Sequence, residues 1–218
     1  MVIAAEAREF SGIFSRLDSV KRVGWARGVQ FARWSEWRGE KWLFYANGAG
    51  PRSVREALKE KMDVAGIINT GYCGALDPAL KVGDIVVWGE APRECPSRFA
   101  SGEIISSDRV VVTAQEKRAL YERTGAIAVE MEAGAAKEIA QAWGVPFYCI
   151  RSVSDEASED MPLDFNEYRD AEGRFVLSKI ALGAMKKPFT RIPALRKLEA
   201  NCKIASESLG DFFADCRF

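Results

Sequence analysis

Carboxylate side chains are the candidate acid and base groups of this chain. Its 218 residues include no histidine, which excludes Ser-His-Asp and Cys-His arrangements for nucleophilic catalysis. Four carboxylates occupy suggestive positions: Glu9 follows the first apolar segment, Glu130 and Glu132 precede an alanine-rich segment, and Asp155 follows a short apolar one. Asp and Glu side chains can act as general acids and bases. The sequence therefore predicts chemistry carried by carboxylates.

The elements around three of these residues predict that they meet. The segment from Glu132 to Trp143 is rich in strong helix formers and ends at Gly144, and Pro146 prevents its continuation. Phe147–Val153 is apolar and partly β-branched or aromatic, which favours a buried strand. A helix leading into a strand of the same sheet runs antiparallel to it, so Glu130 and Glu132 should lie near Ser154 and Asp155. In open α/β sheets this carboxyl edge is where ligands bind.

Each carboxylate also has a structural interpretation. Glu9 and Glu132 both fall in predicted first helical turns, where the helix dipole favours a negative charge. Asp155 follows a predicted strand, a position typical of turn residues. A functional role is favoured because these carboxylates are expected to lie close together at one edge of the sheet.

The remaining pattern predicts an α/β protein with alternating strands and helices. The expected segments are a strand at Met1–Ala5 leading into a helix through Leu17, a hairpin over Trp25–Tyr45, a glycine loop at Asn47–Pro51, a helix at Ser53–Lys61, a strand at Val64–Asn69, a glycine turn at Thr70–Leu76, a turn and strand at Leu80–Trp88, a loop at Ala91–Gly102, a strand at Ile104–Thr113 and an amphipathic helix from Arg191. The glycine loop lacks the third glycine of a dinucleotide fingerprint, so that interpretation is weak. Residues 1–218 are expected to form one domain, with 186–218 as a C-terminal helical extension.

Composition limits the classes of partner and the compartment that we expect for this protein. Lys and Arg together equal Asp and Glu at 31 each, so net charge gives no reason to expect nucleic acid or an anionic membrane. The five cysteines show no C-x-x-C pair, which argues against a disulfide framework or structural zinc, and a reducing cytoplasm is expected. The sequence shows no apolar run long enough for a membrane span and no signal-peptide core.

Three motifs carry a resemblance to a known family. AVEMEA before the predicted helix, VPF in the strand after it and R-S-V-S-D ending at Asp155 closely resemble the signature region of the purine nucleoside phosphorylase and methylthioadenosine/S-adenosylhomocysteine nucleosidase superfamily. The string INTGYCGALDPALKVGDIVV resembles the family's second signature. The resemblance implies a three-layer α/β fold, nucleoside phosphorylase/hydrolase-like, with a mixed central sheet and flanking helices.

The resemblance also implies roles for individual residues. Asp155 would protonate a purine at N7, Glu132 would clamp the ribose hydroxyls and Glu9 would activate water. The family's usual methionine is replaced by Glu6, which leaves Glu6 in a shifted register as the alternative to Glu9. The substrate-binding positions implied are Glu130, Met131, Arg151, Ser154, Ala49, Tyr72, Cys73, Gly74, Val110, Val111 and Phe165. Val110 and Val111 also suit a core strand, and Phe165 also suits a hydrophobic lid.

The function implied is hydrolysis of the N-glycosidic bond of adenosine-type purine nucleosides, with no cofactor and no metal. Relatives that use phosphate carry an arginine and a serine where this chain has Asn69 and Tyr72, so water is the expected co-substrate rather than phosphate. Two alternatives stay open: a purine nucleoside phosphorylase, including a hopanoid-pathway type, and a non-catalytic nucleoside-binding protein. A homo-oligomer, most simply a two-fold dimer, is expected.

Overall fold

The computed structural model describes residues 1–23, 29–170 and 175–218. In these residues ten strands form one mixed sheet, in the order β2-β3-β4-β1-β5-β10-β6-β7, with β9 pairing with both β5 and β8. The strands are β1 Val2–Ala4, β2 Lys21–Arg22, β3 Phe31–Trp37, β4 Glu40–Ala46, β5 Ile67–Ala75, β6 Ile85–Gly89, β7 Ala100–Ser101, β8 Ile104–Ser106, β9 Ala128–Glu130 and β10 Phe147–Asp155. The central strands β4, β1, β5 and β10 are parallel to one another. Their carboxyl ends therefore meet at one edge.

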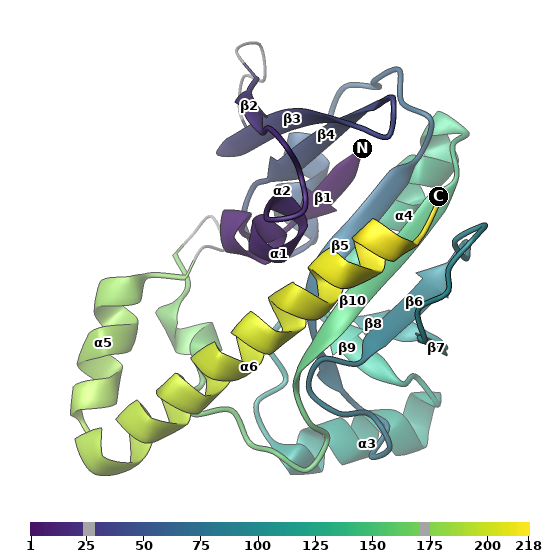
Figure 1. Cartoon of the computed structure of the whole chain (residues 1–218). Helices are drawn as coiled ribbons and strands as arrows, with labels where there is room; N and C mark the ends of the chain where they lie inside the picture. Colours follow the sequence, from purple (N-terminus) through teal and green to yellow (C-terminus); the bar gives the residue numbers. More distant parts are fainter. Residues whose placement is uncertain (24–28, 171–174) are drawn as a thin grey trace.

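Helices cover both faces of this sheet (Figure 1). They are η1 Ala7–Phe10, α1 Ser11–Phe14, α2 Pro51–Ala57, α3 Ala114–Thr124, α4 Ala133–Trp143, η2 Phe165–Tyr168, α5 Leu177–Met185 and α6 Pro188–Asp215. Side chains of β1 alternate between two buried clusters: Ile3 packs with α2 and α4, whereas Val2 and Ala4 pack with α1 and α6. This alternation is the period of a strand buried on both faces. The three-layer α/β prediction is confirmed.

The α4–β10 unit matches its prediction closely. The predicted helix begins at Ala133, one residue later than expected, and ends at Gly144, which adopts a left-handed conformation with φ 72°. That conformation at the end of a helix favours glycine. The predicted strand continues two residues further, to Asp155, and all nine of its residues are buried.

The glycine turn predicted for Thr70–Leu76 is wrong. Residues 70–75 instead continue β5 beyond the predicted strand at Val64–Asn69. The extension is held on both sides, by β10 along most of its length and by β9 at Gly74 and Ala75. Two hydrogen-bonded neighbours fix an extended backbone that the local glycine content alone does not favour.

The strand predicted for Ile104–Thr113 is also wrong beyond Ser106, where β8 ends. Val110 lies outside the strands that the structure describes. The Asn166 side chain accepts from the backbone N–H of Val110 at 2.8 Å and donates to its carbonyl at 3.0 Å. A side chain thus satisfies the backbone groups that a neighbouring strand would otherwise bind.

Smaller differences concern boundaries. The first helix is divided into η1 and α1 and ends at Phe14, α2 lies at Pro51–Ala57 rather than Ser53–Lys61, and the expected loop at Ala91–Gly102 contains the short strand β7. The hairpin is confirmed in β3 and β4, whose turn places Arg38 and Gly39 at φ 55° and 79°. Its predicted first residues, 25–28, lie outside the described residues.

The C-terminal helix begins at Pro188 and crosses one face of the sheet (Figure 1). Leu209, Phe212 and Phe213 bury their side chains in the same cluster as Phe10 and Ile13. A disulfide links Cys95, in the loop after β6, to Cys216, just after α6. The two cysteines are 121 residues apart, so no C-x-x-C signal marks them, and the sequence did not predict this single bond. Within the described part of the chain, no helix has both the length and the apolar character needed to cross a membrane.

Candidate active site

A cavity of about 180 Å³ lies at the carboxyl ends of β1, β5, β9 and β10. The predicted site residues that line it are Glu9, Ala49, Tyr72, Cys73, Gly74, Val110, Val111, Glu130, Met131, Glu132, Arg151, Ser154 and Asp155. They come from six separate segments of the chain. The parallel strands β1, β4, β5 and β10 bring four of these segments together at the same edge, and β9, which is antiparallel to β5, adds Glu130.

Glu9 is buried in η1 and reaches back to β5. Its carboxylate accepts the backbone N–H of Tyr72 at 3.0 Å and that of Glu6 at 2.8 Å. Burial raises the pKa of Glu9, and the positive charge of Arg151 opposes that rise. A carboxylate with a raised pKa is suited to accept a proton from water.

The close approach of Glu9 to β5 depends on Gly71. This residue has φ 129°, and a Cβ atom built on it would overlap the Glu9 carboxylate and lie 2.8 Å from Nη1 of Arg151. Only glycine provides both the positive φ and the space at this position. The glycine thus serves the site, although not as part of a turn.

Glu6 has a different environment from Glu9. Its side chain is partly exposed and pairs with the exposed Arg8 at 2.5 Å. Its backbone N–H donates to the Glu9 carboxylate at 2.8 Å. The geometry therefore favours Glu9 as the functional carboxylate of this segment.

The carboxylate of Glu130 binds groups of the protein itself. Its carboxylate accepts the backbone N–H groups of Glu132 at 2.7 Å and Ala133 at 2.9 Å, the hydroxyl of Ser106 and the guanidinium of Arg151. The first N–H groups of a helix have no partner within the helix. Glu130 thus satisfies the start of α4, which leaves Glu132 available for another role.

Glu132 faces the glycine loop before α2. Its carboxylate accepts the backbone N–H of Gly50 at 2.7 Å and lies 3.1 Å from Nη2 of Arg151. Burial and the nearby Glu130 raise the pKa of Glu132 to about 7, against the attraction of Arg151. A buried carboxylate with few partners is suited to accept hydrogen bonds from hydroxyl groups of a ligand.

Asp155 is the last residue of β10 and lines the cavity together with Ser154. Its Oδ1 atom accepts the hydroxyl of Ser154 at 2.7 Å, and its Oδ2 atom accepts from Nζ of Lys117 at 2.6 Å. Lys117, on α3, is fully buried. Lys117 is not among the residues predicted from the sequence, because a lysine among the charged residues of a helix is typical of a solvated face.

Phe165 is the one predicted site residue that does not line the cavity. It packs edge-on against Phe175, which does line it, with ring centroids 6.0 Å apart. Phe175 thus takes the place in the cavity lining that was predicted for Phe165. Five further residues line the cavity without having been predicted from the sequence: Ala5, Arg8, Arg109, Val129 and Met161.

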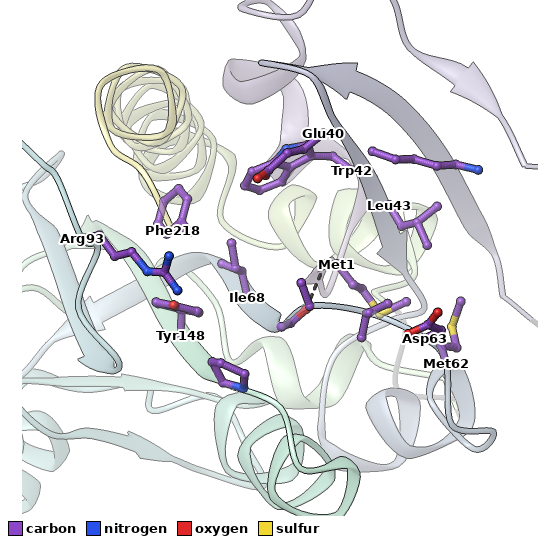
Figure 2. A pocket seen from close by; sticks show the side chains of 15 residues that line it. Met1, Glu40, Trp42, Leu43, Met62, Asp63, Ile68, Arg93, Tyr148 and Phe218 are labelled. Atoms are coloured by element: carbon purple, nitrogen blue, oxygen red, sulfur yellow. Dashed lines mark hydrogen bonds between the residues drawn. The ribbon is translucent and has the colours of Figure 1, made fainter.

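A larger cavity, of about 790 Å³, lies at the opposite edge of the sheet. Figure 2 shows Arg93, Tyr148 and Phe218 on one side of it and Leu43, Met62 and Asp63 on the other. It lies at the amino ends of the parallel strands, and its described lining includes no cluster of buried carboxylates. The buried carboxylates thus favour the smaller cavity, rather than the larger one, as the candidate active site.

Comparison with known proteins agrees with this fold. A 5'-methylthioadenosine/S-adenosylhomocysteine nucleosidase of Shewanella denitrificans is 29% identical over 150 residues, an alignment that covers 51% of this chain and 65% of that protein. The futalosine hydrolase of Helicobacter pylori superposes with a TM-score of 0.67 at 16% identity, covering 98% of this chain and 94% of that one. A Neisseria meningitidis 5'-methylthioadenosine/S-adenosylhomocysteine nucleosidase in complex with methylthio-immucillin-A gives a TM-score of 0.62 at 22% identity, with 96% and 97% covered.

A family model matches part of the chain. Residues 89–182, which include Glu130, Glu132 and Asp155, match the model described as the phosphorylase superfamily. The fold and the motifs on either side of α4 agree with that match. Over this part of its length the chain is similar to the phosphorylase superfamily.

Proposed function

We propose that the protein is a nucleosidase that hydrolyses the N-glycosidic bond of adenosine-type purine nucleosides, such as methylthioadenosine or S-adenosylhomocysteine. The observation that carries the proposal is the convergence of Glu9, Glu132 and Asp155 on one cavity beside Met131. Glycosidic bonds break through an oxocarbenium-like state that needs a protonated leaving group, a nucleophile and a fixed sugar. Three carboxylates match these three needs.

Asp155 and Ser154 form the end of the cavity assigned to the base. The Asp155 carboxylate is buried and held by Ser154. It would deliver a proton to N7 of the leaving purine and accept a hydrogen bond from a 6-amino group. This second contact ranks adenosine-like substrates above inosine.

Glu132 and Met131 form the part of the cavity assigned to the sugar. Glu132 would accept hydrogen bonds from the ribose hydroxyls, and Met131 would pack on the ribose. Glu9 would take a proton from the attacking water. Arg151 joins these groups, since it binds Glu130 and Glu132 and lowers the pKa of Glu9 against the effect of burial.

Water is favoured over phosphate by the state of the arginines at the cavity. A phosphate dianion requires cationic donors. Arg8 is paired with Glu6, Arg109 with Glu116, and Arg151 with Glu130 and Glu132. Phosphate would have to displace one of these carboxylates and lie near Glu9. Phosphorolysis stays the second candidate function, because the superfamily includes both reactions and three arginines line the cavity.

The test is incubation with adenosine, methylthioadenosine, S-adenosylhomocysteine and inosine, with and without phosphate. We expect free adenine and a free sugar, at a rate that phosphate does not change. A sugar 1-phosphate formed in proportion to added phosphate would replace this proposal with phosphorolysis. Binding without turnover of any nucleoside would favour the non-catalytic nucleoside-binding protein.

The Asp155→Asn variant links the activity to the cavity. We expect at least a ~10²-fold loss of turnover of adenine nucleosides, the usual scale for a lost general acid. Asp164→Asn is the matched control, because Asp164 is exposed and lies outside the cavity lining. Near-normal turnover by Asp155→Asn would place the acid elsewhere.

We further propose a cytoplasmic homodimer. Support for the dimer comes from the exposed apolar side chains of α5 and the start of α6: Leu177, Leu182, Met185 and Phe189. In the cytoplasm we expect the Cys95–Cys216 pair to be reduced to two thiols. Cell fractionation, with alkylation of free thiols before lysis, tests the location.

A further inference from the structure

Lys117 places a buried ammonium group directly behind Asp155. Its side chain is fully buried, whereas the Asp155 side chain is 10% exposed. Its Nζ atom lies 2.6 Å from Oδ2 of Asp155, 2.7 Å from the carbonyl of Glu156 and 3.0 Å from the carbonyl of Glu159. An ammonium group has three N–H donors and no acceptor. Each of the three donors thus has one acceptor.

This arrangement fixes the hydrogen bond of one oxygen of Asp155. Because Lys117 can only donate, Oδ2 accepts from it, whereas the Ser154 hydroxyl, 2.7 Å from Oδ1, has the carbonyl of Cys73 as a second acceptor at 3.2 Å. Lys117 is thus a donor held in contact with Asp155, and it can replace a proton that Asp155 gives to a leaving group.

We propose that Lys117 is a positioning residue that supplies the proton which Asp155 passes to the leaving purine. This inference rests on the proposed nucleosidase function. Lys117 does not line the cavity and contacts the site through the Asp155 carboxylate. A lysine can give up its proton when buried, unlike an arginine.

The step balances in atoms and charge. As the C–N bond breaks, its electron pair moves to the purine, Lys117 gives a proton to Asp155, and Asp155 gives a proton to N7. Lys117 becomes a neutral amine, and Asp155 ends with the number of protons with which it began. The attacking water forms the new C–O bond and gives its proton to Glu9. After product release, Glu9 loses a proton to solvent and Lys117 regains one.

A structural role is the competing explanation. Lys117 also binds the carbonyls of Glu156 and Glu159, so its loss would loosen the segment that follows β10. The test must therefore separate proton supply from folding and from charge. Two variants and two leaving groups do so.

The experiment compares Lys117→Met and Lys117→Arg with the unchanged chain on adenosine and on 4-nitrophenyl riboside, whose nitrophenolate leaves without a proton. On adenosine we expect both variants to lose at least ~10²-fold in kcat. On the nitrophenyl riboside we expect losses below ~5-fold, because that leaving group does not need the proton. The matched control is Arg118→Met, which removes a cation at the exposed position next to Lys117 on α3 and should change neither rate.

Each outcome decides the matter. Equal losses on both substrates indicate a structural role, and recovery of adenosine turnover in Lys117→Arg indicates that charge alone suffices; either result overturns the inference. If the variants do not fold, the solvent deuterium isotope effect on the unchanged chain decides. It should be larger for adenosine than for the nitrophenyl riboside, and equal effects contradict the relay. Absence of any nucleoside turnover by the unchanged chain refutes the proposed function itself.

Discussion

Glu6 and Glu9 provide a matched pair for testing which carboxylate takes the proton from the attacking water. Glu9 is buried and bound by two backbone N–H groups, whereas Glu6 is partly exposed and pairs with Arg8. We expect Glu9→Gln to lower kcat by at least ~10²-fold, because an amide cannot take a proton from water. Glu6→Gln should stay within a few fold. Steady-state rates with methylthioadenosine measure both, and equal activity of the two variants would contradict the assignment.

Glu132 makes a prediction about stability and pH. Its pKa is raised by burial to about 7 in the folded protein, from an ordinary value of 4.5. The folded state therefore binds more protons than the unfolded state between these values, so this residue's contribution to stability falls as pH rises through the window.

Glu132→Gln should remove that pH dependence. Its side-chain oxygen can still accept the N–H of Gly50. We expect the Tm of the variant, relative to the unchanged chain, to rise between pH 4.5 and pH 8. Thermal unfolding at a series of pH values measures this difference. A constant difference would show that Glu132 ionises as readily in the folded chain as in the unfolded one.

At the scale of elements, α6 packs directly on the helix that follows Glu9. A Cβ atom on Gly12 would overlap the carbonyl of Ser206, and one on Gly210 would overlap the carbonyl of Gly12. The two backbones are thus in contact, and η1, which carries Glu9, leads straight into α1. The C-terminal helix thereby supports the position of Glu9.

Gly210→Ala tests this support. Alanine favours a helix over glycine by about 1 kcal/mol, but overpacking a close contact costs about 1–3 kcal/mol. We expect the cost of overpacking to exceed the gain in helix propensity. The variant should therefore unfold at lower denaturant concentration and turn over nucleoside more slowly. Lys203→Ala, an exposed change on the same helix, should alter neither. A more stable Gly210→Ala variant would show that α1 and α6 separate without cost.

Local signals explain what the sequence predicts about these elements. Gly144 and Pro146 define the end of α4 and the start of β10, and the lengths of the two elements place Glu130 and Glu132 near Asp155. Features that depend on distant partners are not predicted in this way. Residues 70–75 are extended because β9 and β10 flank them, and Val110 leaves the sheet because Asn166 binds it. Lys117 is buried because Asp155, 38 residues later, pairs with it.

At the scale of the molecule, the two ends of the sheet differ in chemistry. The carboxyl edge contains the buried carboxylates, whereas the described lining of the larger cavity at the amino edge has no such cluster. Helix α5 projects from the body of the protein and contacts α6 (Figure 1). Its apolar side chains Leu177, Leu182 and Met185 are exposed. Apolar side chains gathered in this way are typical of protein–protein contacts.

The proposed dimer gives the last prediction. We expect light scattering at micromolar concentration to give twice the mass of the 24.1 kDa chain. The double variant Leu182→Glu and Met185→Glu should be monomeric, because a carboxylate buried without a partner in an apolar interface is costly. Ser178→Glu adds a charge at another exposed position of α5 and should remain a dimer if that position lies outside the contact. A monomeric unchanged chain would refute the dimer, and a double variant that still dimerises would move the interface away from α5.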